Sequence, residues 1–382
     1  MNNKPPKNWK RVTLGELLDY ERPDKYIVSS EDYSDSYKTP VLTAGKTFIL
    51  GYTNDPEGIY KNLPVIIFDD FTTESKYVDF DFKVKSSAMK ILKAENNITL
   101  KYLYYLMQTL SFNHDTHKRY WISEYSKLKI DIPDKIEEQQ EIVQVLDTMS
   151  DIIRLRKECI SHAQDLIPAL FQEMFKQYIK QKDKHISIGS VTSDTKQINP
   201  LKFFETEFYY IDIASINNDT GIIETPKIIN INETPPSRAR KLVQTNDVII
   251  SMTRPYLKGF SIIPKHLDGQ IVSTGFSVLR SIPEKILPLY LFAYARTDMF
   301  VGQLIPKMKG ANYPAVRDSD VRSVKIPLPP IELQEQFAEK VEKINSYIKE
   351  QQEELANAKQ MFQSLLHHAF TGELTRRAYG KI

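Results

Sequence analysis

The organisation of this chain is visible in one short stretch, Ile326-Pro327-Leu328-Pro329-Pro330-Ile331-Glu332-Leu333-Gln334, and in its earlier counterpart. The counterpart is Ile132-Pro133 followed by Ile136-Glu137-Glu138-Gln139, and the two glutamines stand 195 residues apart. Behind each glutamine, apolar residues recur at that same interval. An internal repeat of this kind indicates a duplicated structural unit, and it takes precedence over weaker signals in the same sequence.

The repeated apolar residues follow one another at alternating steps of four and three residues. This spacing predicts a coiled-coil seam along one side of a long helix, roughly 60 Å in each copy at 1.5 Å per residue. One slot of the series is polar in both copies, Arg156 and Gln351. The predicted seam consists of Ile142, Leu146, Met149, Ile153, Ile160, Ala163, Ile167, Leu170 and Met174 in the first copy, and of Phe337, Val341, Ile344, Ile348, Leu355, Ala358, Phe362, Leu365 and Ala369 in the second.

We expect the two helices to pair with each other as an antiparallel coiled coil, because neither can bury its seam alone and both lie in one chain. A polar residue inside such a seam can fix the register of the pair at some cost in stability. The alternative is a pair of unrelated amphipathic helices that pack on separate cores.

The duplication continues outside the helices, in four short blocks that keep the same order in both halves. The blocks pair Val12–Leu17 with Ile186–Val191, Val65–Ile67 with Val248–Ile250 at an interval of 183, Ser86–Leu92 with Ser273–Leu279, and Ile98–Tyr104 with Ile286–Phe292. Strand-like apolar runs and short helical segments alternate in each half, which predicts an α+β chain made of two pseudo-repeated α/β lobes. The expected domains are a first lobe at 1–133, a first helix at 134–180, a second lobe at 181–327, and a second helix with a tail at 328–382.

Composition agrees with two ordinary globular lobes. The 382 residues are 41% hydrophobic and 26% charged, with a net charge of only +2, so a nucleic-acid ligand would require basic residues gathered on particular faces. Cys159 is the single cysteine, which excludes an internal disulfide and favours a reducing cytoplasm. No apolar run approaches membrane-spanning length, and the first residues lack the apolar core of a signal peptide, so we expect a cytoplasmic protein without a membrane partner.

Motifs of the common catalytic and metal sites are absent from the sequence. It has no G-x-x-x-x-G-K-[S/T] loop, no G-x-G-x-x-G, no H-E-x-x-H and no D/N-P-P-Y/F motif of an adenine methyltransferase. The pairs His114/His117 and His367/His368 have no acidic cluster beside them and are expected to be ordinary histidines. We therefore expect no catalytic residue and no bound metal in this chain.

One group of residues keeps an enzymatic alternative open. Asp69-Asp70 is followed by Glu74 and Lys76, an arrangement that faintly resembles a Mg²⁺-dependent nuclease site. The second half carries Ser251-Met252 where the aspartates stand in the first. A nuclease present in only one of two copies is the weaker hypothesis.

Basic and hydroxyl side chains alternate with aromatic ones in both halves. Lysine and arginine neutralise phosphates, and arginine, asparagine and lysine can also read base edges. Each cluster alone is more typical of a solvated surface, but their presence in both lobes favours a nucleic-acid ligand. The candidate DNA-binding residues are Lys46, Thr47, Lys76, Tyr77, Lys83, Lys85, Ser86, Lys118 and Arg119 in the first half, and Ser237, Arg238, Arg240, Lys241, Arg254, Tyr256, Lys258, Thr274, Lys307, Lys309, Asn312 and Tyr313 in the second.

The order of lobe, Ile-Glu-x-Gln segment and long helix, followed by all three again, resembles the specificity subunit of a type I restriction-modification system. The resemblance spans nearly the whole chain and is carried by Pro40–Lys46, Val65–Leu92, Pro236–Arg240, Asp247–Ser251, Arg254-Pro255, Ser273–Phe276, Gly310–Pro314 and Ile326–Gln334. The first copy departs from the family pattern, because Asp134-Lys135 replaces the prolines and this connection is one residue shorter. The start of the first helix is therefore left open.

The resemblance implies a DNA-binding subunit with two target-recognition domains, each reading one half of a split, asymmetric site in double-stranded DNA. The paired helices would be the spacer between the lobes, related by a pseudo-twofold axis, and the docking surface for two modification (methyltransferase) subunits. S-adenosylmethionine, ATP and Mg²⁺ would belong to partner subunits and no cofactor to this chain. The sequence leaves open whether a restriction (motor-nuclease) subunit is a further partner.

A rival from another class is a coiled-coil scaffold or adaptor whose lobes bind peptides. The basic and hydroxyl clusters argue against it, because peptide binding does not call for them in both lobes. Salt-dependent binding to duplex DNA would separate the two hypotheses.

Overall fold

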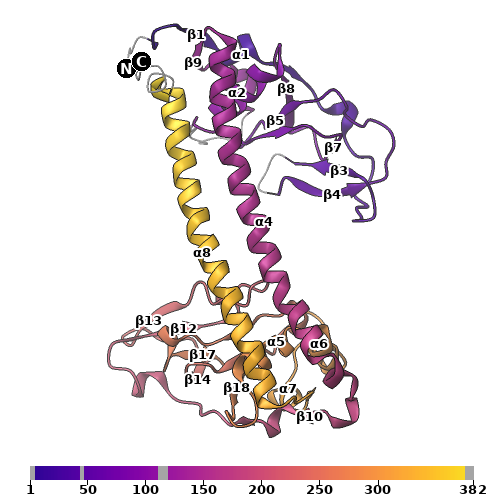
Figure 1. Cartoon of the computed structure of the whole chain (residues 1–382), viewed down its shortest axis with the longest axis vertical. Coiled ribbons are helices and arrows are strands. Elements are labelled where there is room, and N and C mark those ends of the chain that lie inside the picture. Colours follow the sequence, from indigo (N-terminus) through magenta and orange to yellow (C-terminus); the bar gives the residue numbers. More distant parts are fainter. Residues whose placement is uncertain (1–4, 44–46, 111–118, 375–382) are drawn as a thin grey trace. The chain divides into compact units, whose positions relative to one another are not determined.

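The structure, a computed structural model, describes residues 5–43, 47–110 and 119–374 (Figure 1). The chain forms two compact units. The first unit comprises Met1–Lys157 together with Glu353–Ile382, and the second comprises Glu158–Gln352. The division falls inside two long helices, α4 (Ile136–Lys180) and α8 (Ile331–Phe370), so that each unit contains part of both.

The first unit contains two sheets, one strand pair and short helices. The four-stranded sheet has the order β2 (Asp19–Glu21), β8 (Met89–Lys93), β5 (Val65–Asp69), β6 (Ser75–Val78), and the three-stranded sheet has the order β4 (Ile49–Thr53), β3 (Thr39–Leu42), β7 (Lys83–Val84). The strand pair is β1 (Trp9–Thr13) with β9 (Lys129–Pro133), and the helices are α1 (Leu14–Leu17), α2 (Asn97–Met107) and α3 (Tyr120–Ser123).

The second unit repeats this plan with other loop lengths. Its sheets have the orders β11 (Thr192–Ser193), β18 (Phe276–Ser281), β15 (Val248–Ser251), β16 (Phe260–Ile262) and β13 (Lys227–Asn230), β12 (Glu207–Ile211), β17 (Ile271–Ser273), β14 (Ala239–Leu242). The strand pair is β10 (Ile186–Ser187) with β19 (Lys325–Ile326), and the helices are α5 (Pro288–Ala295), α6 (Asp298–Leu304) and α7 (Asp318–Arg322).

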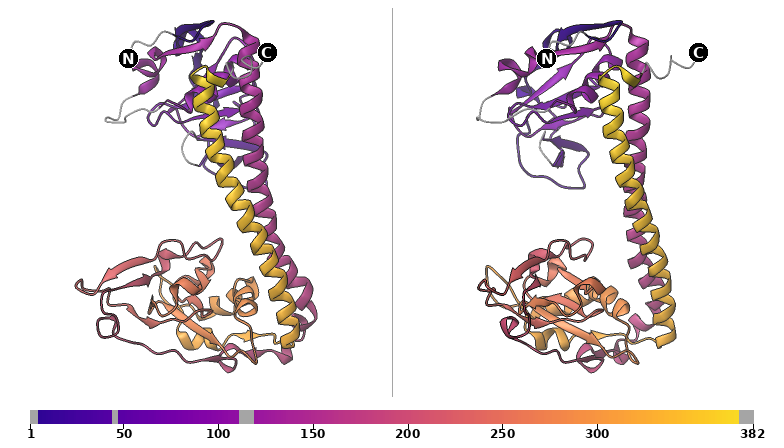
Figure 2. Two further views of the ribbon diagram at one scale, coloured as in Figure 1. Left: turned by 60° about the vertical axis from the view of Figure 1, so that its left-hand side comes forward. Right: turned by 90° about the vertical axis from the view of Figure 1, so that its left-hand side faces the viewer.

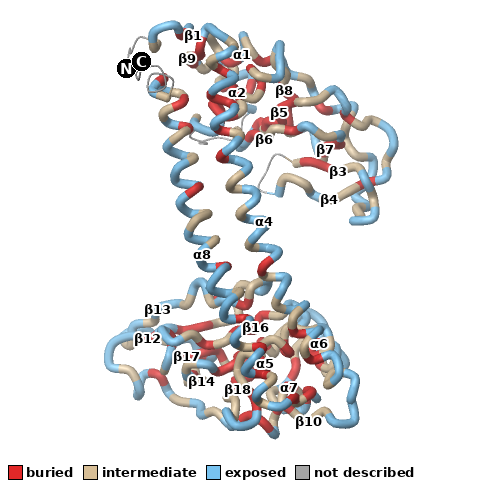
Figure 3. Tube along the Cα trace, in the orientation of Figure 1, coloured by how far each residue is buried: buried red, intermediate tan, exposed pale blue. Residues whose placement is uncertain are grey.

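Central strand β5 is buried on both faces, as a continuous apolar run predicts. Side chains alternate between the faces of a strand, so Ile66 and Phe68 pack into the core that α2, α4 and α8 cover, whereas Val65 and Ile67 pack into the core against the three-stranded sheet. Figure 3 shows β5 in the colour of buried residues. Strand β15 divides its residues in the same way in the second unit. Each lobe is therefore a helix layer, a central sheet and a second sheet.

Strand pairing in the two units corrects the predicted alignment of the halves. Ile66 of β5 pairs with Leu92 of β8, and Val248 of β15 pairs with Leu279 of β18. The equivalent residues are thus Ile66 and Val248, 182 residues apart, and the interval of 183 predicted from the apolar runs is wrong by one residue. Runs of similar apolar residues slide past each other easily in a sequence, whereas the hydrogen bonds of a sheet do not.

The long helices meet in opposite directions within each unit. In the first unit, Ile142 and Leu146 at the start of α4 share a core with Phe362 and Leu365 at the end of α8, and the two segments run side by side in both views of Figure 2. In the second unit, the end of α4 shares a core with Phe337 and its neighbours at the start of α8. Every predicted seam residue is buried or half-buried, which agrees with an antiparallel coiled coil.

Close to the lobes, three deeply buried residues lie one position beyond predicted seam residues. Phe171, Phe175 and Leu366 are at most 2% exposed, while the predicted Leu170, Met174 and Leu365 are half-buried. There the helices face the globular cores as well as each other, and Phe171 packs against Tyr290 as well as Phe337. The sequence signal for this second buried face was the pair Phe171 and Phe175, four residues apart. We did not predict the burial of these two residues.

Two features are shared by both copies of the repeat, the polar slot and the glutamine, and the structure shows partners for them. Arg156 forms an ion pair with Glu354 of α8 inside the first unit. Gln139 donates from Nε2 to the Pro133 carbonyl (3.2 Å) and accepts at Oε1 from the Thr99 hydroxyl (3.0 Å).

Gln334 makes the corresponding bonds in the second unit, to the carbonyl of Pro329 (2.9 Å) and from the N–H of Leu287 (2.9 Å). Pro133 therefore corresponds to Pro329 and not to Pro327. The first connection, Asp134-Lys135, is one residue longer than the second, Pro330 alone, which reverses the predicted difference.

The predicted domain ranges stay predictions. Helix α4 begins at Ile136 and helix α8 at Ile331, inside the ranges expected for the two helices.

Candidate nucleic-acid interface

Backbone hydrogen bonds bring together four of the predicted segments at one end of β15 in the second unit. The Met252 N–H donates to the Gly275 carbonyl (2.9 Å), and the Met252 carbonyl accepts from the Val316 N–H (2.9 Å). The Thr274 N–H donates to the Arg238 carbonyl (2.8 Å). We call residues 236–241, 252–258, 273–276 and 307–316 the second loop cluster.

Arg254 is the most constrained basic residue of this cluster. Its N–H donates to the Pro314 carbonyl (2.8 Å), and its backbone adopts the left-handed conformation, with φ 47°. The guanidinium donates from Nη2 to the Asn312 carbonyl (2.9 Å), and its central carbon lies 4.8 Å from the centre of the Tyr313 ring. The predicted segments around Arg254 and Tyr313 thus meet in space.

Exposure divides the predicted residues of the second unit into two groups. Ser237, Arg238, Tyr256, Lys309, Asn312 and Tyr313 are exposed, Tyr313 by 71%. Arg240, Lys241, Arg254, Lys258, Thr274 and Lys307 are half-buried.

Three half-buried lysines bond to groups of the protein itself. Lys241 donates to the Phe276 carbonyl (2.7 Å), and burial lowers the pKa of its ammonium despite the nearby Asp318. Lys258 pairs with Asp298 at 2.7 Å and lowers the pKa of that carboxyl group. Lys307 donates to the Ser323 hydroxyl (2.6 Å). These three lysines support the loops, and the exposed Arg238 and Lys309 are better placed for phosphates.

The first unit has the same backbone frame around Asp70. The Asp70 N–H donates to the Ala88 carbonyl (3.0 Å), and the Asp70 carbonyl accepts from the Tyr120 N–H (2.9 Å). A further bond joins the Lys85 N–H to the Leu42 carbonyl (3.0 Å). We call residues 42–43, 47–48, 69–74, 85–88 and 119–121 the first loop cluster.

The predicted residues of the first unit differ in how free they are. Thr47, Ser86 and Arg119 are exposed. Lys85 forms an ion pair with Glu31. Lys46 and Lys118 lie outside the described residues.

Lys76 and Tyr77 of β6 are half-buried and engaged within the unit. Lys76 lies 3.8 Å from Glu74. The Tyr77 ring packs on Tyr104, and the Lys101 ammonium lies 5.0 Å from its centre. Both residues stay candidates, with Tyr77 the weaker because its ring belongs to the lobe's packing.

Lys83 does not belong on a DNA-binding surface. Its side chain is 2% exposed, and its ammonium donates to the Asp55 carboxylate (2.8 Å). This bond is the largest cause that holds the pKa of the Asp55 carboxyl well below its usual value, with further help from Ser29. The cluster of basic and hydroxyl residues at 83–87 put Lys83 in the predicted set, but only the structure shows that its side chain is buried.

The nuclease alternative fails on the burial of Asp70. The carboxylate is 1% exposed, pairs with the buried Lys90 ammonium (2.8 Å), and accepts from the Trp121 N–H (2.8 Å). A carboxylate so enclosed cannot hold Mg²⁺ beside a substrate. In the part of the chain that the structure describes, no three His, Cys, Asp or Glu side chains gather as a metal site. His114 and His117 lie outside that part, and His368 bonds to Glu373.

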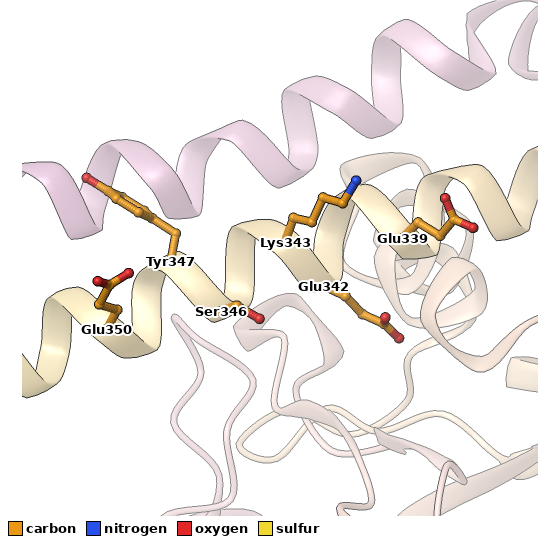
Figure 4. A pocket seen from close by; sticks show the side chains of 6 residues that line it. All are labelled: Glu339, Glu342, Lys343, Ser346, Tyr347 and Glu350. Carbon is orange, nitrogen blue, oxygen red and sulfur yellow. The ribbon is translucent and has the colours of Figure 1, made fainter.

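A hollow on α8 in the second unit is chemically distinct from the loop clusters. It is lined by Glu339, Glu342, Lys343, Ser346, Tyr347 and Glu350. Figure 4 shows Tyr347 and Glu350 directed away from Glu342 along this stretch of helix. Three carboxylates against one ammonium disfavour a phosphate ligand here.

Among the described helices, none combines the length and apolar character that crossing a bilayer requires.

Comparison with known protein families finds the same repeat. A family model described as "Type I restriction modification DNA specificity domain" matches residues 6–162 and again 186–358, which covers most of the chain and repeats as the structure does. The chain belongs to the type I restriction-modification specificity subunit family.

Relatives of known identity span nearly the full length of this specificity subunit. The specificity subunit of the type I restriction enzymes EcoR124I/EcoR124II from Escherichia coli is 34% identical over 359 residues, 88% of this chain and 86% of the relative. The MjaVIII specificity subunit of Methanocaldococcus jannaschii is 23% identical over 94% of this chain and 92% of its own length. The crystal structure of a type I S subunit from M. genitalium shares the fold, with a TM-score of 0.52, 16% identity and 97% coverage of both chains.

Proposed function

We propose that this chain is the non-catalytic DNA-recognition subunit of a type I restriction-modification complex, and that each lobe reads one half of a split DNA site. The observation that carries the proposal is the duplicated backbone frame, in which Asp70 and Met252 make equivalent bonds beneath the two loop clusters. A duplicated frame presents loops in the same manner twice, as two half-sites require.

The side chains on the two frames differ, which supports an asymmetric site. Asp70 and Lys90 of the first lobe correspond to Met252 and Ser277 of the second. Arg254 corresponds to Thr72 at the interval of 182 that the strand pairing gives. Base edges are read by side chains, so lobes with different side chains should read different sequences.

The paired helices are the proposed docking surface for two methyltransferase subunits. Their seams are buried, while charged and amide side chains, including the acidic hollow at Glu339–Glu350, cover the outer faces. S-adenosylmethionine, ATP and Mg²⁺ would then act on partner subunits, with a restriction subunit as a further partner. Because the proposed ligand is chromosomal DNA, we still expect a cytoplasmic location.

A lobe exchange tests modular reading of the target. The chain is expressed with its methyltransferase subunit, and methylated adenines are mapped across the genome. Replacing residues 181–327 by the equivalent lobe of a relative should change one half of the methylated sequence and leave the other half as it was. Replacement of the first lobe, residues 1–133, is the matched control and should change the other half.

Two results would contradict the proposal. A methylated sequence that is unaltered by either exchange rules out recognition by separate lobes. A purified complex whose affinity for duplex DNA does not fall with salt would favour the peptide-binding scaffold instead.

A further inference from the structure

We propose that Arg254 reads a guanine in the half-site of the second lobe, by donating two hydrogen bonds to the N7 and O6 acceptors that guanine shows in the major groove. This inference rests on the proposed function and assigns one base contact within it. Arginine is the side chain whose planar fork matches that pair of acceptors.

The backbone at Arg254 is held in a conformation that arginine rarely adopts. Its φ of 47° and ψ of 56° are left-handed, and Lys258 at the other end of the turn Pro255–Leu257 is left-handed as well, with φ 53°. Left-handed backbone at residues other than glycine persists only where the surroundings impose it, and it is concentrated at functional sites. Here the Arg254 N–H is held by the Pro314 carbonyl, at 2.8 Å.

The guanidinium is fixed on two sides before any ligand arrives. One Nη2 hydrogen is donated to the Asn312 carbonyl, and the plane lies near the Tyr313 ring. Nε is buried and has no hydrogen-bond partner among the described residues. Apart from the bond to Asn312, the guanidinium makes no hydrogen bond with the described residues, so the Nη1 hydrogens and the second Nη2 hydrogen remain for two acceptors side by side.

The loop that carries Tyr313 is itself closed and rigid. Lys309 and Ala315 exchange two backbone hydrogen bonds of 2.9 Å at its base. Gly310 has a φ of 101°, and an added Cβ would lie 3.2 Å from the Tyr313 carbonyl oxygen, so the loop requires glycine there. Tyr313 is thus held at the surface, 71% exposed, with Arg254 against it.

A phosphate contact would not require this much orientation. Phosphates are met by flexible, exposed cations, and Arg238 and Lys309 supply these on the same loop cluster. Lys258 and Lys241 have carboxylates within 4 Å, whereas Arg254 has none among the described residues. An arginine that is oriented by a carbonyl and a ring, and not neutralised by an acid, is suited to a base edge.

The first test uses wild-type protein and altered DNA. The complex with its methyltransferase subunits is titrated with duplexes in which each guanine of the second half-site is replaced in turn by 7-deazaguanine, which lacks the N7 acceptor. We expect one such replacement to weaken binding by part of the about 5- to 150-fold that a bidentate base contact is worth, because the O6 acceptor remains. The same replacements in the first half-site provide the background.

The second test repeats the titration with four variants. Arg254→Ala should weaken binding to the natural site and abolish the sensitivity to that one 7-deazaguanine. Arg254→Lys keeps the charge but loses the planar fork, so it should also weaken binding to the natural site. Tyr313→Phe keeps the ring and should behave as wild type. Arg238→Ala, on the same loop cluster, should instead weaken binding to all sequences alike and make the salt dependence shallower.

Three outcomes would overturn the inference. They are a second half-site without guanine on either strand, equal 7-deazaguanine sensitivity in wild type and Arg254→Ala, and a uniform loss across sequences in Arg254→Ala, which marks a phosphate contact. Each of these leaves the proposed function intact, because wild-type binding would still be site-specific. A wild-type complex without any site preference would contradict the proposed function itself.

Discussion

Asp70 and Met252 occupy the same position in the two lobes, one residue beyond the central strand, and make the same pair of backbone hydrogen bonds. Each N–H donates to the loop before the neighbouring strand of the sheet, at Ala88 or Gly275. Each carbonyl accepts from the chain at or just before a short helix, at Tyr120 or Val316. Only the side chains differ. Asp70 is paired with a buried Lys90, and Met252 needs no partner.

The charge of Asp70 should be required only because Lys90 is there. Asp70→Asn keeps an acceptor for the Trp121 N–H but leaves the Lys90 ammonium buried without its counter-charge, so we expect a loss of about 3–5 kcal/mol in the free energy of unfolding. The double variant Asp70→Met/Lys90→Ser installs the pair of the second lobe and should recover part of that loss. Urea unfolding measures both variants, and a larger loss in the double variant than in Asp70→Asn would contradict this dependence on Lys90.

Gln334 should stabilise the start of α8 through its amide. Gln334→Leu removes the acceptor of the Leu287 N–H and the donor to the Pro329 carbonyl, and each unsatisfied group costs about 1–3 kcal/mol. Gln334→Glu keeps the acceptor but replaces the donor by a buried carboxylate facing carbonyl oxygens, so its loss should be at least as large. Thermal unfolding of the two variants tests this order, and an equal melting temperature for wild type and Gln334→Leu would contradict it.

Acid should destabilise the first unit partly through Asp55. The pKa of its carboxyl group is depressed in the folded chain, so its stabilising contribution is complete above the ordinary value of 3.8 and is lost as the pH falls below that value. Lys83→Met removes the main cause, so the fall in stability between neutral pH and pH 3 should be smaller in this variant. Lys85→Met, on the exposed ion pair with Glu31, is the control.

The comparison is read from urea midpoints along a pH series. Parallel pH profiles for wild type and Lys83→Met would contradict the assignment.

Phe171 should be essential to the second unit although it lies outside the predicted seam. It is 1% exposed and packs on Phe175, Tyr290 and Phe337, so Phe171→Ala should cost about 3–5 kcal/mol. Leu166 on the same helix is 55% exposed, and Leu166→Ala should change stability by less than about 0.5 kcal/mol. Denaturant unfolding of the two variants tests this. If Phe171→Ala cost as little stability as Leu166→Ala, burial of Phe171 outside the seam would not matter.

The sequence predicted the repeat and the helices well because both are periodic. Residues such as Leu146 and Val341 recur at fixed steps, and a long series tolerates a few misread positions. The one-residue error between Val65 and Ile66 arose where a run of similar apolar residues offers no landmark. Only the strand pairing of Ile66 and Val248 fixed it.

The candidate site was predicted only in outline, because exposure and partners depend on tertiary structure. The segments around Arg238, Arg254 and Tyr313 do meet, which their separation along the chain did not show. Lys83 was misjudged because a lysine on a short strand resembles any surface lysine. The bond between Asp70 and Lys90 was missed because opposite charges twenty residues apart have no spacing rule.

The composition of the first unit from two distant parts of the chain has a consequence for its synthesis. Leu366 and Ala369 of α8 lie in the same core as Trp9, Leu14 and Ile142. These last contributors leave the ribosome only after the whole second unit has been made. The first lobe must therefore wait, with part of its apolar interior still uncovered, until translation is nearly complete, and this interval is when the nascent chain would be most open to proteases and chaperones.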